Sequence, residues 1–499
     1  MVYIPGFLVN KVYERGSLKN TEEGFSFSFK NTMTPLKISG LSELKIHIDE
    51  EPFPTEDVEL ELGGRTFKIS KEPLKELVSF AKNSKLLIRL KGKNLSEGKH
   101  VIKISFVTHE YGGVTLKVKD AIGDLEYLTV WQKIKKILMK PFKRERRKPL
   151  IVEGTLGGVP LNPDFSRLEA VLRREEPDRV PLFEAEIEIP IKEWFLGHEV
   201  DTPEDEVEFY IRAGYDFVPI IPPFFTPRLM HTAEGDERSW ITESEGIIKT
   251  MEDIEKFPWP DPDKVDFSSF REIAKILPPK MKTLGLLSPA AVFGNTSQSM
   301  GLENFSYALY DNIEVVEALF ERIGSSYLKI AKKIVKMPKL GAVLMSDDLA
   351  HQGGCLVNPK IYRKYVFPWY KKIGKIMEEA GIPFIFHSDG DFSAVFDDLA
   401  DCGVKAIHPI EPQAMDIVEV KKNYGDKFCI FGNIDLDYTL TRGSIEEVEE
   451  LVKKRIKELA PGGGWGLASS NSIPDYVNPE NFKAMVEATK KYGKYPIKL

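Results

Sequence analysis

Cysteine is scarce in this 499-residue chain, which has only Cys355, Cys402 and Cys429. Thiols so few and so scattered cannot build a disulfide framework or a CxxC-type zinc site, so a reducing compartment fits best. The sequence also has no run approaching the eighteen or more apolar residues of a membrane span, and its start lacks the basic and apolar regions of a signal peptide. We therefore expect a cytoplasmic protein without a membrane span.

An excess of positive charge is also absent, because the formal net charge is −7 at pH 7. Binding of DNA or RNA needs a basic surface that displaces phosphate counterions, so the composition argues against a nucleic-acid partner. The hydrophobic fraction of 42% is enough for large cores, and the length indicates two or three domains. We expect a globular protein that acts on a small molecule, and the sequence leaves a homo-oligomer open.

Residues 1–122 have the pattern of β-strands joined by glycine turns. In 58–62 apolar residues alternate with acidic ones, and a Gly-Gly turn leads into a second strand over 65–69. Another hairpin is predicted between 102–106 and 114–118, again across a pair of glycines. The pattern predicts an all-β, sandwich-like accessory domain in front of the rest of the chain.

Residues 123–164 differ in character, because an apolar stripe there is accompanied by a run of lysines and arginines that ends at Lys148. A helix of this composition suits a membrane surface or an RNA contact. It also suits a solvated linker helix that packs its stripe on a neighbouring domain. We favour a basic helical linker, because isolated charge runs are usually just solvated.

From residue 165 onward, short apolar runs alternate with amphipathic helical stretches. The runs are 180–187, 217–221, 283–287, 342–345, 383–386, 404–407, 428–431 and 464–468. Buried parallel strands have such continuous apolar runs because helices cover them. The eight units in 165–499 predict an α/β fold, a (β/α)₈ TIM barrel with an insertion between its second and third strands. A doubly wound open sheet is the alternative, but no GxGxxG follows the first run.

In such a barrel the active site lies at the carboxyl ends of the strands, and here these positions are unusually polar. Histidines and carboxylates on rigid strand ends suit divalent-metal binding or general acid–base catalysis. We predict catalytic roles for Asp347, Asp348, His387 and Asn471. Substrate-binding roles are predicted for Glu184, Ser288, His408, Glu411, Asn433, Asp435 and Ser470.

Some of these positions have a structural alternative. His408 stands before a proline, where a histidine is more often a hydrogen-bonded wall of a site than a ligand. One carboxylate of the Asp347-Asp348 pair is expected to cap the following helix while the other faces the pocket. The combination of His387 with Asp389 gives the sharpest prediction, because placing it at a strand end is costly for packing alone.

A set of short motifs recurs along the predicted barrel. They are Arg179-Val180-Pro181-Leu182, Asp347-Asp348, Asn358-Pro359, Tyr362-Arg363, Pro368-Trp369-Tyr370, Phe386-His387-Ser388-Asp389-Gly390, Gly403-Val404, Phe431-Gly432-Asn433-Ile434-Asp435 and Pro479-Glu480-Asn481. In order and spacing the set resembles the uroporphyrinogen decarboxylase superfamily, which includes the decarboxylase itself and corrinoid-linked methyltransferases. The resemblance covers residues 165–495 and implies an enzyme built on a TIM barrel.

The decarboxylase itself departs from this chain in the segments that contact its substrate. After strand one it has an Arg-Gln-Ala-Gly-Arg-Tyr segment whose arginines hold substrate carboxylates, where this chain has the acidic stretch 183–188. Its catalytic aspartate after strand two corresponds to 220–223, and its Gly-His-Gly after strand eight corresponds to 470–472. Acidic residues cannot hold an acidic porphyrinogen, so the resemblance does not imply decarboxylation in the heme pathway.

The methyltransferase branch resembles this chain more closely, in the helix after strand four and in the lack of the arginine segment. Its zinc-dependent members hold the metal with a His-x-Cys after strand five and a cysteine after strand eight, where this chain has His-Ser-Asp at 387–389 and Ser-Asn at 470–471. A site of His387, Asp389 and the strand-one Glu186 would be harder and would suit zinc or another divalent ion. The resemblance implies a methyltransferase that works with a corrinoid carried by a partner protein. A decarboxylase of a substrate other than uroporphyrinogen and a non-catalytic ligand-binding barrel remain alternatives.

Overall fold

The computed structural model describes most of the C-terminal part of the chain, namely residues 149–224, 246–287 and 290–499. Of residues 1–122 and 225–245 it describes mainly the strands. The chain divides into two compact units, which are 1–145 with 229–242 and 146–228 with 243–499. The predicted linker helix up to Lys148 lies outside the described residues, and so does Ser288. In the described part of the chain, no helix is both long and apolar enough to cross a membrane.

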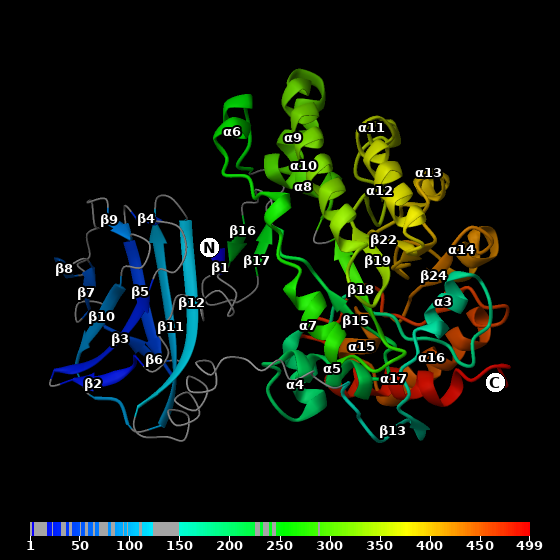
Figure 1. The fold of residues 1–499 in the computed structure, drawn as a ribbon, viewed down its shortest axis with the longest axis horizontal. Helices are drawn as coiled ribbons and strands as arrows, with labels where there is room; N and C mark the ends of the chain where they lie inside the picture. Colours follow the sequence, from blue (N-terminus) through cyan, green and yellow to red (C-terminus); the bar gives the residue numbers. More distant parts are fainter. Residues whose placement is uncertain are drawn as a thin grey trace. The chain divides into compact units, whose positions relative to one another are not determined.

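The N-terminal unit contains two five-stranded sheets (Figure 1). The first has the order β1 (Val2–Tyr3), β12 (Gly112–Ile122), β11 (Gly98–Thr108), β5 (Ser42–Ile48) and β6 (Glu51–Phe53). The second has the order β2 (Lys19–Thr21), β3 (Gly24–Lys30), β10 (Lys85–Lys91), β7 (Val58–Leu62) and β8 (Arg65–Lys68). Two-stranded sheets pair β4 (Leu36–Ile38) with β9 (Val78–Phe80) and β16 (Met230–Thr232) with β17 (Ser239–Ile241).

Both predicted hairpins are present, because β7 pairs antiparallel with β8 and β11 pairs antiparallel with β12. The alternation in β7 buries Val58, Leu60 and Leu62 and leaves the glutamates between them partly exposed. The rings of Phe25 in β3 and Phe53 in β6 meet edge to face, with 5.5 Å between centroids. This contact joins one sheet to the other.

His100 of β11 is a buried histidine that bonds two acceptors. Its Nδ1 lies 2.6 Å from Asp49 Oδ2, and its Nε2 lies 2.9 Å from the carbonyl oxygen of Ser96. A ring that donates from both nitrogens is an imidazolium. Burial lowers the pKa of His100, but the bonds to Ser96 and Asp49 outweigh burial and raise the pKa above the usual 6.5.

The N-terminal unit should therefore lose stability as the pH rises. A folded-state pKa above the unfolded value means that the stabilisation is fully present below about pH 6.5 and disappears as the pH passes the folded pKa. As the pH rises from about 6.5 through the folded-state pKa of His100, we expect the melting temperature of this unit to fall in the wild type. In a His100→Gln chain it should change less. Calorimetry at a series of pH values measures this, with the exposed His198→Gln as control. Parallel curves for wild type and His100→Gln would contradict an imidazolium at His100.

The C-terminal unit is built on a curled parallel sheet of seven strands (Figure 1). Their order is β15 (Phe217–Ile220), β18 (Lys282–Leu287), β19 (Leu340–Ser346), β22 (Phe384–His387), β23 (Ala406–His408), β24 (Cys429–Phe431) and β25 (Trp465–Gly466). Each strand is parallel to the next along the chain. The second to eighth predicted strands are thus confirmed as neighbours in sequence order, so their carboxyl ends meet at one edge of the sheet.

The first predicted strand, 180–187, lies beside β25 and pairs with it through isolated bridges rather than a continuous ladder. Leu182 bridges Leu467 in the parallel sense, and the Phe183 N–H donates to the Leu467 carbonyl at 2.8 Å. The ring of Phe183 also lies 5.4 Å, centroid to centroid, from that of Phe217 in β15. This segment therefore contacts both end strands of the sheet.

Helices alternate with the strands along the chain. They are α3 (Ser166–Leu172), α4 (Ile189–Leu196), α5 (Pro203–Arg212), α6 (Met251–Lys256), η2 (Pro262–Lys264), α7 (Ser268–Ile276), α8 (Phe293–Met300), α9 (Leu302–Asp311), α10 (Ile313–Ile334), α11 (Pro359–Ile361), η3 (Tyr362–Val366), α12 (Phe367–Glu379), η4 (Ser393–Val395), α13 (Phe396–Asp401), α14 (Ile417–Tyr424), α15 (Thr439–Arg442), α16 (Ile445–Leu459) and α17 (Pro479–Tyr492). Two small hairpins join β13 (Thr155–Leu156) to β14 (Val159–Pro160) and β20 (Ala350–His351) to β21 (Gly354–Cys355).

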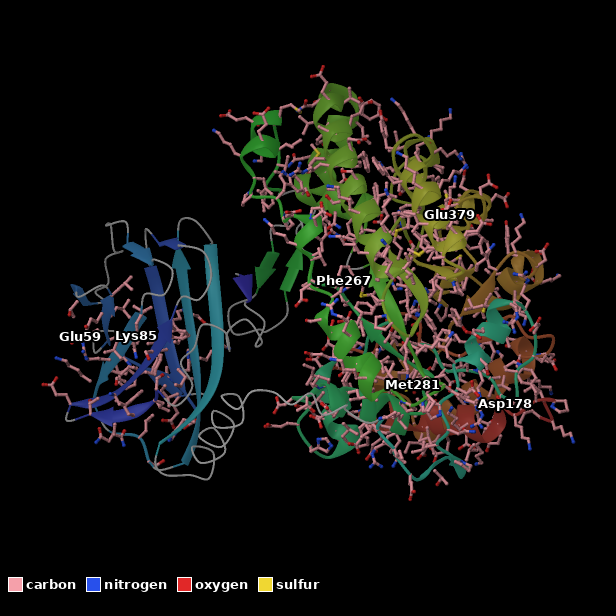
Figure 2. The ribbon with its side chains drawn as sticks, viewed as in Figure 1. Glu59, Lys85, Asp178, Phe267, Met281 and Glu379 are labelled. Carbon is pink, nitrogen blue, oxygen red and sulfur yellow. The ribbon has the colours of Figure 1, made fainter. Side chains whose placement is uncertain are left out.

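Apolar residues at helical spacing explain how these helices bury one face. In α10 the buried positions include Val316, Leu319, Phe320 and Ile323. Their spacing of three or four residues places them on one side of the helix. Side chains fill the space between helices and sheet, and Met281, just before β18, is fully buried there (Figure 2). The sheet is thus held rigidly beneath the residues that follow its strands.

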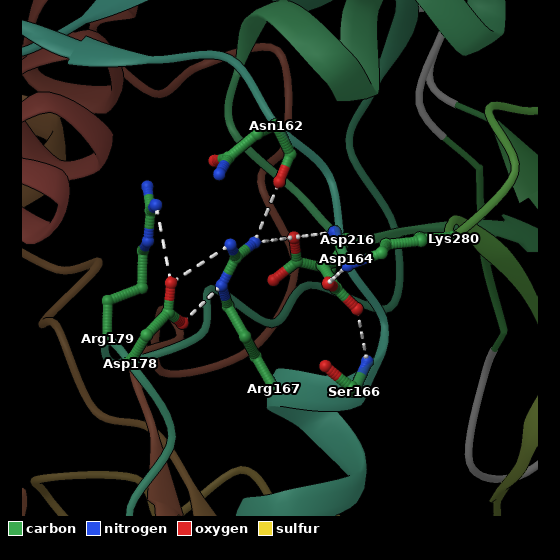
Figure 3. Close-up of polar contacts among 8 residues, drawn as sticks. All are labelled: Asn162, Asp164, Ser166, Arg167, Asp178, Arg179, Asp216 and Lys280. Atoms are coloured by element: carbon green, nitrogen blue, oxygen red, sulfur yellow. Dashed lines mark hydrogen bonds and ion pairs between the residues drawn. The ribbon is translucent and has the colours of Figure 1, made fainter.

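A buried ionic network lies at the amino ends of the strands (Figure 3). The Arg167 guanidinium of α3 donates to Asp178 Oδ1 at 2.6 Å and to Asp216 Oδ1 at 2.8 Å. Asp216 stands directly before β15, and both it and Arg167 are buried. Burial lowers the pKa of the neighbouring Lys490 to about 8. The network lies at the strand ends opposite the predicted active site, where residues of a TIM barrel serve stability.

Candidate metal centre

Three side chains come together at the carboxyl ends of two paired strands. His387 ends β22, Asp389 follows it, and Asp348 follows β19, whose Ser346 is the register partner of His387. One ligand atom from each lies within 4.8 Å of those of the other two. His387 Nε2 is 3.4 Å from Asp389 Oδ1 and 3.9 Å from Asp348 Oδ1. These three residues are called the Asp-His-Asp group below.

The loop that carries Asp389 is fastened by neighbouring strand ends. The Asp389 N–H donates to Asp348 Oδ1 at 3.1 Å, and the Gly390 N–H donates to Glu411 Oε2 at 2.9 Å. The Asn471 amide donates to both carboxylate oxygens of Asp389, each at 2.9 Å. Because Asn471 follows β25, three strands along the sheet from β22, its bond crosses the strand ends. Asp389 is therefore held in one orientation.

Gly390 cannot be replaced without moving this loop. Its φ of 75° lies in the left-handed region, and a Cβ there would stand 2.5 Å from the backbone of His351. The glycine lets the chain turn sharply after Asp389, so the carboxylate points back toward His387. The glycine that ends the motif Phe386-His387-Ser388-Asp389-Gly390 thus has a steric basis.

The electrostatics of the group favour one imidazole between two carboxylates. Burial lowers the pKa of His387, but Asp389 and Asp348 raise it, and the result lies above the usual 6.5. Burial raises the pKa of Asp389, but His387 and Asn471 hold it below its ordinary range. Burial and the charge of Asp389 raise the pKa of the nearby Glu411. A cation at Nε2, whether a proton or a metal ion, is therefore favoured.

The donor set fits a divalent metal ion. A buried imidazole and two carboxylates give one nitrogen and up to four oxygen atoms, which zinc, manganese or iron accept and which a soft thiolate-binding ion does not prefer. The three groups are preorganised by bonds to the backbone of Asp389 and to its side chain, as a metal site requires. The third member of the group is Asp348, and the predicted Glu186 does not belong to it.

Comparison with known proteins identifies the family. The profile described as uroporphyrinogen decarboxylase (URO-D) matches residues 241–492, just over half of the chain. The chain belongs to the uroporphyrinogen decarboxylase family. Residues 8–123 also match the profile described as hydroxymethylglutaryl-CoA reductase, N-terminal domain, which covers a smaller part of the chain.

Relatives within this family include both decarboxylases and methyltransferases. The uroporphyrinogen decarboxylase of Chlorobaculum tepidum is 26% identical over 271 residues, which are 50% of this chain and 74% of that protein. The methylcobamide:CoM methyltransferase MtbA of Methanosarcina acetivorans is 25% identical over 260 residues, which are 52% of this chain and 74% of that protein. The match to the methylcobamide:CoM methyltransferase MtaA of Methanosarcina barkeri is 29% identical over 137 residues but spans only 38% of that protein.

A solved structure supports the same fold. A methyltransferase from Methanosarcina mazei has a TM-score of 0.50 and 18% identity, and the match covers 66% of this chain and 98% of that one. At this identity the likeness concerns the fold alone. The members of the uroporphyrinogen decarboxylase family among these relatives are enzymes.

Several predicted site residues take other places in this family fold. Asp347 is fully buried, and its carboxylate accepts the backbone N–H groups of Val292, Phe293 and Gly294 and the Tyr370 hydroxyl. It therefore caps α8, which precedes it in the chain, whereas the sequence predicted that one aspartate caps the following helix. Burial raises the pKa of Asp347 to about 6 despite these bonds.

Glu184 and Glu186, from the segment before α4, have opposite surroundings. Glu184 is fully buried and accepts the N–H of Ser469 at 2.6 Å and its hydroxyl at 2.9 Å, and burial raises its pKa to about 8. Glu186 is exposed and does not belong to the Asp-His-Asp group. Glu184 thus anchors the loop that leads to Asn471.

The remaining predicted residues line the strand ends in different ways. Asp435 accepts the N–H groups of Tyr438 and Thr439 at the start of α15, so it acts as a helix cap. The Ser470 hydroxyl accepts the Leu436 N–H at 3.2 Å. Asn433 is buried, and among the described residues its amide atoms have no hydrogen-bond partner.

Ser388 is a supporting residue that the sequence did not single out. Its hydroxyl accepts the Leu349 N–H at 3.0 Å, and so ties the loop after β22 to the loop after β19. Leu349 and Ser388 are separated by 39 residues. A serine within a glycine-containing loop gives no sequence signal for such a distant contact.

Proposed function

We propose that this chain is a methyltransferase that binds a divalent metal ion through Asp348, His387 and Asp389 and receives its methyl group from a corrinoid carried by a partner protein. The observation that carries the proposal is the Asp-His-Asp group at the carboxyl ends of the strands, in a family that includes methylcobamide:CoM methyltransferases. A zinc or similar ion there would supply a Lewis acid that lowers the pKa of the nucleophilic group of a methyl acceptor.

Each side chain has a separate task in this proposal. His387 offers Nε2 and the two aspartates offer carboxylate oxygens, while Asn471 fixes the carboxylate of Asp389. Glu411 lies beside the group and holds the turn at Gly390. Together these acidic residues would favour a neutral or cationic small-molecule acceptor over an anionic one.

A metal ion held by carboxylate oxygens suits a different class of methyl acceptor from an ion held by cysteine thiolates. Cys402 follows helix α13 and Cys429 begins strand β24, so both lie at the amino ends of strands, whereas the Asp-His-Asp group lies at the carboxyl ends. Burial raises the pKa of both thiols. We propose an acceptor that presents oxygen or nitrogen, because two carboxylates leave the ion harder than cysteine ligands would.

The finer architecture belongs to the same proposal. We propose that 180–187 is the first strand of an eight-stranded barrel, supported by the contact of Phe183 with Phe217. The domain organisation would be an all-β accessory domain over 1–122, a linker over 123–164 and a barrel over 165–499. The support for an all-β domain is the two five-stranded sheets of the N-terminal unit.

A methyl-transfer assay tests the proposal directly. The full chain, loaded with Co²⁺ or Zn²⁺, is mixed with methylcobalamin and a panel of small alcohols, amines and thiols, and loss of the methylcobalamin absorbance is recorded. We expect turnover that disappears in a His387→Ala chain and persists in His351→Ala, whose exposed side chain lies outside the group. Carbon dioxide release from a carboxylic acid without methyl transfer would support a decarboxylase instead, and binding without turnover would support a ligand-binding barrel.

Metal affinity should weaken in acid. The pKa of His387 is raised, so the proton competes for Nε2 at and somewhat above pH 6.5, while Asp389, whose pKa is lowered, stays ionised. We expect calorimetric titration with Co²⁺ to give an affinity that falls as the pH drops from 8 through this range, by up to about tenfold per pH unit for one displaced proton. An affinity that stays constant between pH 8 and pH 5.5 would exclude His387 as a ligand.

A further inference from the structure

The Asp-His-Asp group is backed by a second histidine. His387 Nδ1 lies 2.8 Å from His408 Nδ1, and the two rings belong to the neighbouring strands β22 and β23. Two ring nitrogens at this distance share one proton, so one of them donates and the other accepts. The other nitrogen of His387, Nε2, faces the carboxylates of Asp389 and Asp348.

A bound metal ion would decide which histidine donates. His387 can bind an ion only through a lone pair on Nε2, so its own proton must then sit on Nδ1. That Nδ1–H needs an acceptor, and His408 Nδ1 is the atom it faces. If His408 were the donor, the proton of His387 would sit on Nε2, between the two carboxylates, and would occupy the position proposed for the ion.

The ring of His408 is fully buried and packs beside that of Phe183. When His408 accepts through Nδ1, its proton sits on Nε2, which is fully buried and has no hydrogen-bond partner among the described residues. The ring of Phe183 lies 5.2 Å from that of His408, centroid to centroid, tilted by 60°. Phe183 itself stacks on Phe431, with 4.0 Å between centroids, and is fixed in place.

We infer that His408 is a positioning residue, which accepts the Nδ1–H of His387 and thereby turns the Nε2 lone pair of His387 toward Asp348 and Asp389. The inference rests on the proposed metal site and deepens it. It names the residue outside the ligand set whose hydrogen bond keeps the proton of His387 on Nδ1. Outer partners of this kind typically change metal affinity by 10–100-fold. His408 would contact neither the ion nor the substrate.

A pair of amide substitutions tests the role of His408. In His408→Asn the side-chain oxygen takes roughly the place of Nδ1, so it can still accept from His387. In His408→Gln the amide reaches the place of Nε2 instead, so the acceptor is lost while polarity and burial stay similar. His408→Leu removes every acceptor. Co²⁺ affinity by calorimetry, the Co²⁺ absorption spectrum and the melting temperature are measured for each full-length chain.

We expect His408→Asn to bind Co²⁺ within about threefold of wild type with the same spectrum, and His408→Gln to bind 10–100-fold more weakly with an altered spectrum. His408→Leu should bind Co²⁺ as weakly as His408→Gln. If His408→Leu fails to fold, the comparison of His408→Asn with His408→Gln tests the inference without it. Equal affinities for His408→Asn and His408→Gln would overturn the inference. A wild-type chain that binds no Co²⁺ would instead overturn the proposed metal site, so the two failures are distinguishable.

Discussion

An Arg167→Ala chain is expected to lose about 3–5 kcal/mol of unfolding free energy, because the substitution leaves the buried carboxylate of Asp216 without its guanidinium. The side chain of Arg167 is 5% exposed and that of Asp216 is 1% exposed, so solvent cannot replace the lost bond. Arg167 also donates to the Asn162 carbonyl and to Asp178, and both acceptors lose a donor as well. Urea unfolding followed by fluorescence measures the change.

The matched control for this substitution is Arg173→Ala. Arg173 follows the same helix and pairs with Glu175, but its side chain is 59% exposed. Surface pairs of this kind contribute roughly 0–1 kcal/mol. A loss in Arg167→Ala no greater than in Arg173→Ala would show that the network at the amino ends of the strands does not hold the fold. Metal affinity should be unchanged in any Arg167→Ala protein that remains folded.

A His387→Ala chain is expected to lose stoichiometric metal while keeping its melting temperature within a few degrees of the metal-free wild type. The substitution removes the nitrogen ligand and leaves two carboxylates, which bind a divalent ion weakly on their own. His387 is buried and hydrogen-bonded to His408, so its loss leaves a buried ring nitrogen without a partner and should cost about 1–3 kcal/mol, which lowers the melting temperature by only a few degrees in a chain of this size. Metal content after gel filtration and thermal melting of both chains measure the two quantities.

Three outcomes for His387→Ala have different meanings. Loss of metal with a fall in melting temperature of no more than a few degrees supports the metal site. A wild type without metal, together with loss of ligand binding or activity in the variant, would make His387 a general acid or a substrate contact. A large drop in melting temperature with unchanged ligand binding would make His387 structural. His351→Ala is the control, since His351 is exposed and lies just beyond Asp348 in the chain.

The sequence predicted the strands of the sheet well because each is a continuous apolar run. The run 180–187 met the same criterion, yet it pairs with β25 only through isolated bridges. Apolar content shows that a segment is buried, but whether its backbone forms a continuous ladder depends on neighbours far along the chain. The same limit applies to the N-terminal unit, where alternation predicted the hairpins but not the parallel pairing of β1 with β12.

The sequence pointed to His387 and Asp389, which lie together in the structure, but could not choose among the carboxylates around them. His387 and Asp389 stood out because they follow one apolar run, whereas Glu186 lies within the first run, 180–187, and Asp348 follows another run, 342–345. The register that pairs Ser346 with His387 brings Asp348 to the group, and no local pattern encodes that register. Asp347, the residue before Asp348, contributes its carboxylate to the start of α8 instead.

Contacts across many residues were the hardest part to foresee. Asn471 was predicted as catalytic, and the structure places it 82 residues from its partner Asp389 in the chain, where it holds both carboxylate oxygens. His408 was predicted as a substrate contact or a hydrogen-bonded wall, and the structure places it against His387. These roles follow from the packing of strand ends, which local sequence does not specify.

Anomalous diffraction at the cobalt absorption edge, from crystals of the full chain grown with Co²⁺, shows whether Asp348, His387 and Asp389 hold one divalent ion. We expect one strong peak at about 2.0–2.2 Å from His387 Nε2 and from an oxygen of each aspartate. Co²⁺ peaks elsewhere with none between these three side chains, or no peak at all, would contradict the proposed metal site.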